Sequence, residues 1–202
     1  MTPTRAGLRQ YGVALRALLV LTVALGVLYP LAITGLGQVA FARQANGSLL
    51  TEDGATVGSS LIGQSFADAD GNPLPQWFQS RPSAAGDGYD ASASSGSNLG
   101  PENEDLVAAI QERRAAIAAS DGVDPAAVPA DALTASASGL DPHISPAYAE
   151  LQIARVAQAR GLAEESVRAL VAEHVQGRDL GFLGEETVNV LELNLALAAL
   201  AS

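Results

Sequence analysis

The residues best suited to hydrolytic chemistry lie in segment 138–146, where serine, aspartate and histidine follow one another closely. Asp141 and His143 beside a serine invite the interpretation of a catalytic triad. Members of a triad must converge in space next to an oxyanion hole, and closeness in sequence does not provide that arrangement. The pairs Asp141-Pro142 and Ser145-Pro146 fit better as a turn and a helix start. A hydrolase acting through His143 is therefore the weakest of the functions considered.

Acidic pairs offer a second kind of chemistry, the binding of a hard cation by carboxylate oxygens. The pairs are Asp68/Asp70 and Asp87/Asp90, and segment 68–72 resembles the start of a calcium loop. The position where such a loop needs a bidentate glutamate is Gln79. We therefore expect solvated turns here and no metal site. The other histidine, His174, lies on an apolar helical face and is expected to be structural.

The composition excludes several classes of site. The 202 residues include no cysteine, and all 11 basic residues are arginine. Without cysteine there are no disulfides, no thiolate metal sites and no cysteine nucleophile. Without lysine there is no P-loop lysine, Schiff base or Ser-Lys dyad. The net charge of −11 and a pI near 4.4 argue against nucleic acid as a partner, because binding phosphate needs a basic surface.

Charge divides the chain into two parts that suit different surroundings. Residues 1–42 carry three arginines and no acid, whereas residues 43–202 carry eight arginines and all 22 acids, a balance of −14. An uncharged, apolar run extends from residue 17 to residue 40, and about 20 helical residues suffice to cross a bilayer core. We predict a cytoplasmic N-terminus over 1–16, a transmembrane helix over 17–42 and an extracytoplasmic domain over 43–202.

The arginines that precede this helix place the N-terminus in the cytoplasm by the positive-inside rule. Pro30 removes one backbone donor and should kink the helix near Tyr29. The small residues Gly26, Gly35 and Gly37 either leave room for a neighbouring helix or are merely tolerated. Residues 40–42 also fit the cleavage site of a signal peptide, but the apolar run of such a peptide has only about 7–15 residues. We predict a retained anchor.

The domain over 43–202 is expected to be α+β, with its core in the C-terminal third. Large apolar residues number 18 among the 94 residues of 46–139 and 21 among the 63 of 140–202. The middle of the chain should therefore drape over that core or over a partner. Short strands are predicted at 56–63 and 76–79. Helices are predicted at 104–119, from Ser145 to a stop at Gly161, over 167–175 and over 187–200.

Eight short blocks follow one another along nearly the whole chain. They are Tyr29–Leu31, Gln44–Leu49, Gly58–Gln64, Arg81–Ser83, Gly96–Leu99, Thr134–Asp141, Gln152–Ala157 and Val188–Leu195. No block is specific alone, but the ordered set resembles the KdpC family, the C subunits of bacterial Kdp potassium-transporting P-type ATPases. Two positions depart from the family pattern: Ala154 stands in place of proline, and Asp90 follows Tyr89 in place of asparagine.

The resemblance implies a single-span protein of the bacterial inner membrane that works in a complex. The implied partners are a channel-like potassium-translocating subunit, an ATP-hydrolysing P-type subunit, a small fourth membrane peptide and membrane lipid. Since the sequence has neither an Asp-Lys-Thr-Gly phosphorylation motif nor a T-V-G-Y-G filter run, the chain should be an accessory subunit and not the motor or the pore. The family's C subunit is described as a catalytic chaperone that raises the ATP affinity of the hydrolysing subunit.

The resemblance also links Gln152 to nucleotide contact, which would make ATP a ligand. This implication conflicts with the predicted orientation, because Gln152 would then lie outside the cell, where ATP is scarce. Charge bias and hydropathy favour the orientation, so the nucleotide role of Gln152 rests on the resemblance alone. No other cofactor, no metal and no catalytic residue is expected. An anchored extracytoplasmic solute-binding or sensor module, with its own small-molecule pocket, is the alternative function.

Overall fold

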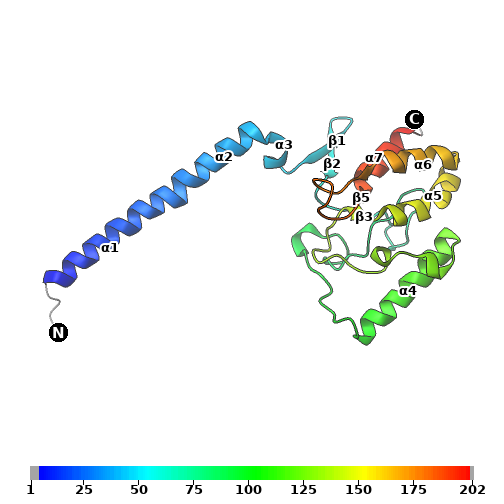
Figure 1. Cartoon of the computed structure of the whole chain (residues 1–202), viewed down its shortest axis with the longest axis horizontal. Coiled ribbons are helices and arrows are strands. Elements are labelled where there is room, and N and C mark those ends of the chain that lie inside the picture. Colours follow the sequence, from blue (N-terminus) through cyan, green and yellow to red (C-terminus); the bar gives the residue numbers. More distant parts are fainter. Residues whose placement is uncertain (1–4, 201–202) are drawn as a thin grey trace. The chain divides into compact units, whose positions relative to one another are not determined.

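The computed structural model describes residues 5–200 and divides the chain into two units, the first ending at Leu49 and the second beginning at Leu50 (Figure 1). The first unit is helical, and the second combines helices with two small sheets. Within the described residues, the segment Arg9–Ala40 is the one helix long and apolar enough to cross a membrane, and its most apolar stretch is 0 % buried. The predicted α+β class with one N-terminal apolar helix is confirmed.

The first unit is a nearly continuous helix interrupted by a π turn. Its elements are α1 (Arg5–Val23), the π-helical turn η1 (Ala24–Leu28), α2 (Tyr29–Ala40) and the short α3 (Ala42–Ala45). At the end of η1 the Tyr29 amide donates to the Ala24 carbonyl, five residues back. Pro30 follows directly and has no amide hydrogen to continue an α-helical ladder. The distortion predicted near Tyr29 therefore takes the form of a widened turn.

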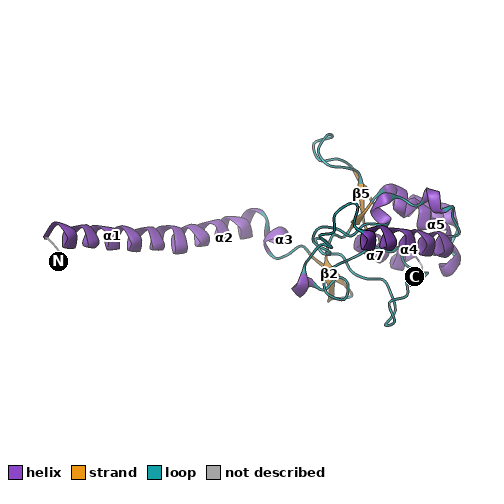
Figure 2. Ribbon diagram, turned by 90° about the horizontal axis from the view of Figure 1, so that it is seen from below, coloured by secondary structure: helices purple, strands orange, loops and turns teal. Residues whose placement is uncertain are grey.

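The second unit opens with a β-hairpin and continues through long loops to one helix (Figure 2). The elements are β1 (Leu49–Glu52), β2 (Ala55–Ser59), η2 (Ala91–Ala93), α4 (Glu104–Asp121), η3 (Pro125–Ala127) and η4 (Ala130–Ala132). Asp53 and Gly54 both have positive φ, as a two-residue type I′ hairpin requires. The predicted helix at 104–119 is confirmed, with an Asn103 cap and a left-handed Gly122 after its last turn.

The C-terminal third holds most of the regular structure. Its elements are β3 (His143–Ile144), α5 (Pro146–Arg160), α6 (Glu164–Glu173), β4 (Val175–Gln176), β5 (Thr187–Asn189) and α7 (Val190–Leu200). The strands form an antiparallel sheet in the order β3-β5-β4, in which Ile144 and Val175 both lie opposite Val188. The predicted ends of α5 are confirmed, because the Ser145 hydroxyl accepts from the Tyr148 amide and Gly161 is left-handed.

Four predicted elements differ from the structure. The strand expected at 56–63 ends at Ser59, and no strand forms at 76–79. The helix expected at 167–175 ends at Glu173, because His174 caps it and Val175 enters the sheet as β4. The segment 187–200 is helical only from Val190, since its first three residues pair with two strands. In the last three cases a tertiary partner overrides the local pattern, whereas after Ser59 the chain makes a local turn in which the Ile62 amide donates to the Ser59 carbonyl at 3.2 Å.

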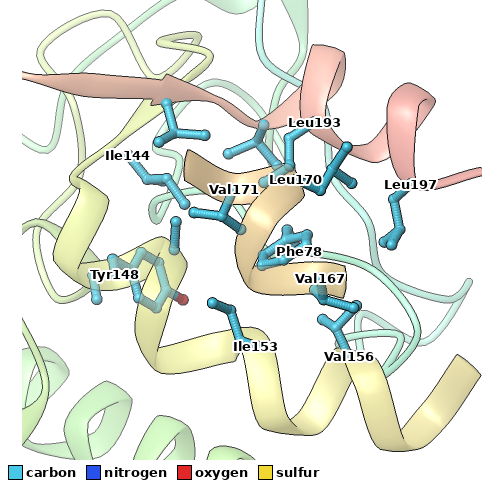
Figure 3. Close-up of a cluster of buried hydrophobic side chains, with 14 of the residues drawn as sticks. Phe78, Ile144, Tyr148, Ile153, Val156, Val167, Leu170, Val171, Leu193 and Leu197 are labelled. Atoms are coloured by element: carbon cyan, nitrogen blue, oxygen red, sulfur yellow. The ribbon is translucent and has the colours of Figure 1, made fainter. Parts of the chain in front are cut away.

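The hydrophobic core lies between α5, α6 and α7, where side chains from all three helices meet in Figure 3. Thirteen of its eighteen buried members come from residues 144–197, as the apolar content of that third predicts. The middle of the chain nevertheless supplies Phe78, which is 0 % exposed and lies against these helices. The middle is thus part of the core and not only a covering over it.

Candidate functional site

Gln152, which the family resemblance singles out, lies on α5 with a side chain that is 0 % exposed. Its Oε1 accepts from the Gln79 amide at 2.7 Å, and its Nε2 donates to the Gln79 carbonyl at 3.2 Å. The same Oε1 accepts from Arg155 Nη2 at 2.6 Å. Every hydrogen-bonding atom of the carboxamide is thereby engaged inside the protein. Its role toward a nucleotide stays a prediction.

A second carboxamide, that of Asn194, binds the backbone of the residue before Gln79 in the same way. Asn194 on α7 is 2 % exposed; its Oδ1 accepts from the Phe78 amide at 2.9 Å, and its Nδ2 donates to the Phe78 carbonyl at 2.9 Å. Together the two side chains satisfy the backbone of segment 78–79 as a neighbouring strand would. The two carboxamides thus take the place of a neighbouring strand at Phe78 and Gln79, while Gln76 lies in a turn and Trp77 in a bend.

Arg155 connects this segment to α4. Its Nε donates to Asp121 Oδ1 at 2.7 Å, and its Nη1 donates to the carbonyls of Pro75 and Trp77 at 2.7 and 3.0 Å. The side chains of Arg155 and Asp121 are 8 % and 4 % exposed, so the ion pair is buried. Burial raises the pKa of Asp121, an effect that the charge of Arg155 opposes. Gln152, Arg155 and Asp121 form one connected network, which we call the amide–arginine network.

This network lies behind one wall of a cavity of about 490 Å³. Asp121 of the network and Gln79, whose backbone Gln152 binds, both line the cavity. The sequence signals for the network were a glutamine and an arginine spaced i, i+3 on a helix, and one asparagine within the apolar run of α7. Neither signal reveals that both helices bind the backbone of the same distant segment.

The structure does not assemble the residues of the hydrolase interpretation. His143 Nδ1 lies 3.1 Å from Asp141 Oδ1, while Arg81 pairs with the other carboxylate oxygen. The Ser145 hydroxyl donates to Asp131 at 2.9 Å and caps α5, so it is committed to structure. Burial alone would raise the pKa of Asp141, but hydrogen bonds from His143 and the charge of Arg81 outweigh it and lower that pKa. The cluster stabilises a turn.

The acidic pairs form self-closed turns. The Asp68 carboxylate accepts from Asn72 Nδ2 at 3.1 Å and from the amides of Asn72 and Asp70 at 2.8 and 3.0 Å, and these hydrogen bonds lower the pKa of Asp68. Asp90 Oδ1 likewise accepts from the Ser92 amide at 2.8 Å. Across residues 5–200, no three histidine, aspartate or glutamate side chains gather as a metal would need. The His174 ring contacts the Leu170 carbonyl at 2.8 Å at the end of α6.

The residues predicted to pack in the membrane all lie on the apolar helix. A methyl group built on Gly35 would meet no atom within 4 Å, and those on Gly26 and Gly37 would meet only one side-chain carbon each, at 3.9 and 3.8 Å. Tyr29, at the π turn before Pro30, is 60 % exposed. These positions are open to a neighbouring helix, and their packing role stays a prediction.

Comparison with known proteins gives one consistent result. A family model described as KdpC, K+-transporting ATPase, c chain, matches residues 11–199. The potassium-transporting ATPase KdpC subunit of Kineococcus radiotolerans is 61 % identical over 194 residues, covering 96 % of this chain and 95 % of that protein. The corresponding subunit of Mycobacterium tuberculosis is 55 % identical over 191 residues, covering 94 % and 97 %.

Proposed function

The chain belongs to the KdpC family of K+-transporting ATPase subunits, and on this premise we propose that it is the non-catalytic, membrane-anchored accessory subunit of an ATP-driven potassium uptake complex. The observation that carries the proposal is the helix Arg9–Ala40, which is apolar and has a 0 % buried central stretch. Such a surface is stable only in lipid or against other apolar helices. A sequence without lysine also supports a partner as the ATP-hydrolysing subunit.

The proposed partners are a channel-like potassium-translocating subunit, an ATP-hydrolysing P-type subunit and a small fourth membrane peptide. We expect all three to co-purify with the tagged full chain from detergent-solubilised bacterial inner membranes. The matched control carries an unrelated single-span helix in place of residues 17–42, so that it keeps the anchor and loses the native helix surface. Recovery of the full chain alone, under conditions that keep other membrane complexes intact, would contradict the proposal.

We further propose that the N-terminus is cytoplasmic and that residues 43–202 face the outside of the bacterial inner membrane. Three arginines before the apolar run and the balance of −14 after it support this orientation. The natural absence of cysteine permits a clean labelling experiment. A membrane-impermeant maleimide should label Ala119→Cys on α4 in intact spheroplasts, and should label Gln10→Cys only after lysis.

Both labelling sites are exposed side chains, so accessibility within the fold does not limit the reaction. The apparent mass of the labelled chain provides a second readout, because a retained anchor leaves residues 1–42 attached. Labelling of Gln10→Cys in intact spheroplasts, or a mature chain that begins near Arg43, would overturn the orientation and the anchor respectively.

We propose that the chain raises the ATP affinity of the hydrolysing subunit through protein contacts and not by holding the nucleotide. The burial of Gln152 supports this route, since a side chain that is 0 % exposed and binds Gln79 and Arg155 through both polar atoms does not meet a phosphate or a base. Gln152 is then a positioning residue that fixes segment 78–79 and Arg155. On this route, weakening Gln152 changes ATP affinity only in the assembled complex, and the isolated chain binds no ATP.

A further inference from the structure

The cavity of about 490 Å³ lies wholly within the second unit and has a volume typical of small-molecule sites. It is lined by the loop residues of segment 65–89 and by one side of α4, with Tyr148 of α5 also at its wall. The apolar part of the lining includes Phe66, Pro82 and Ile117. The cavity can therefore enclose an apolar body of a few carbon atoms.

Two arginines and one acid line this cavity in an otherwise acidic unit. Residues 50–202 hold seven arginines against 22 acids, yet Arg81 and Arg113 both line the cavity. Arg81 is neutralised by Asp141, and the lining residue Asp121 is neutralised by Arg155 at 2.7 Å. Arg113 donates to the Leu133 carbonyl at 2.9 Å and has no ion pair among the described residues. Arg113 is thus the one charged residue of the lining that has no ion pair within the described part of the chain.

Two donors at the cavity also lack an acceptor. Tyr148 is 3 % exposed, and its hydroxyl hydrogen-bonds to no described residue. Burial raises the pKa of that hydroxyl, so it stays protonated and can donate a hydrogen bond. The buried Nε of Arg81 has no partner either. Arg81 Nε is the one buried side-chain polar atom without a partner among the described residues, so the Tyr148 hydroxyl is open at the cavity surface, where an anionic oxygen can accept from it.

We infer that this cavity is a binding site for a small organic oxyanion, a carboxylate or a phosphate monoester carried on a short apolar body. The Arg113 guanidinium and the Tyr148 hydroxyl bind the anionic group, while Phe66, Pro82 and Ile117 enclose the apolar body. The inference depends on neither the partners nor the orientation proposed above, because every residue in it belongs to the second unit.

The chain carries its own reporter for the test. Trp77 is the one tryptophan of the sequence, and its ring centroid lies 6.1 Å from that of Phe66 in the cavity wall. The full chain in detergent is titrated with hexanoate and with hexyl phosphate while Trp77 fluorescence is followed. Hexylammonium controls for insertion of the tail, and inorganic phosphate controls for the anion alone.

We expect a saturable change with hexanoate, hexyl phosphate or both, and none with hexylammonium; the relative affinities identify the carboxylate or the phosphate as the preferred group. Arg113→Gln and Tyr148→Phe should each weaken binding about tenfold. Arg114→Gln, one position along α4 and outside the lining, is the matched control and should bind as the parent does.

Tyr148→Phe removes only the hydroxyl and keeps the ring in the core. It therefore tests the role of the cavity in anion binding even if Arg113→Gln does not fold. Absence of saturable binding up to about 10 mM of either anion would overturn the inference. Equal affinities in the parent, Arg113→Gln and Tyr148→Phe would overturn it too, since binding would then lie elsewhere. Equal fluorescence responses to hexanoate and hexylammonium would also overturn the inference, because the apolar tail would then insert without recognition of the charge.

Discussion

Replacing Gln152 by alanine should cost the second unit about 3–5 kcal/mol of unfolding free energy, the largest effect we expect from a neutral substitution. The change leaves the amide and carbonyl of Gln79 without partners and removes an acceptor from Arg155. Each buried polar group left unsatisfied costs about 1–3 kcal/mol. Urea unfolding of the full chain in detergent, followed by Trp77 fluorescence, measures the loss.

Gln158→Ala is the matched control, because Gln158 lies on the same helix with an exposed side chain. It should change the unfolding free energy by less than about 0.5 kcal/mol. If Gln152→Ala were equally harmless, the hydrogen bonds that define the amide–arginine network would be wrong.

Gln152→Glu separates the structural role from nucleotide contact. Glutamate keeps an acceptor for Arg155 and the Gln79 amide but places an oxygen opposite the Gln79 carbonyl. We expect an intermediate loss of stability and, in complexes that still assemble, a raised KM for ATP. A raised KM without any loss of stability would instead favour direct contact between Gln152 and the nucleotide.

Arg155→Met should be nearly as damaging, with an expected loss of about 3–5 kcal/mol. The substitution leaves the Asp121 carboxylate, which is 4 % exposed, without its ionic partner. It also removes the donor shared by the Pro75 and Trp77 carbonyls. The double variant Asp121→Leu/Arg155→Met removes the unpaired carboxylate as well, so it should recover about half of the lost unfolding free energy. The same urea titration compares the two variants with the parent.

The pH dependence gives an independent readout of Arg155→Met. Burial already raises the pKa of Asp121, and removing Arg155 takes away the charge that opposes this rise. When the pKa of a carboxyl group is higher in the folded than in the unfolded state, the folded protein loses stability as pH rises from the unfolded-state pKa to the folded-state pKa. The deficit of Arg155→Met should therefore shrink on acidification toward pH of about 4.

Arg168→Met is the control for an exposed ion pair. Arg168 and Glu150 are 45 % and 53 % exposed, and such pairs contribute about 0–1 kcal/mol. Equal losses for Arg155→Met and Arg168→Met would contradict the buried nature of the Arg155–Asp121 pair.

The elements that could be predicted are those whose ends are encoded within a few residues. The Ser145 cap with Pro146 and the Gly161 stop define α5 locally, and Asn103 and Gly122 do the same for α4. The apolar run of the first unit is likewise a local property. In contrast, Val175 pairs with β5, and residues 187–189 form β5 by pairing with β3 and β4; a local pattern cannot encode these pairings.

The site was predictable only by resemblance. The resemblance singles out Gln152. However, Gln79, whose backbone it binds, lies 73 positions away in sequence, and the burial of the Gln152 side chain depends on packing. The composition around Phe78 and Gln79 is typical of a short strand, and nothing near them shows that two helical side chains bind their backbone instead. The cavity combines residues from four separate segments, so no single motif predicts it.

The way in which segment 78–79 is held also constrains the order of events during synthesis. Phe78 receives its backbone partner from a residue 116 positions later, close to the end of the chain. A nascent chain on the ribosome therefore exposes Phe78 to water until α7 has been made, and contacts of such long range form slowly. Loss of the last dozen residues would deprive the middle of the polypeptide of its anchor as well as shortening the C-terminus.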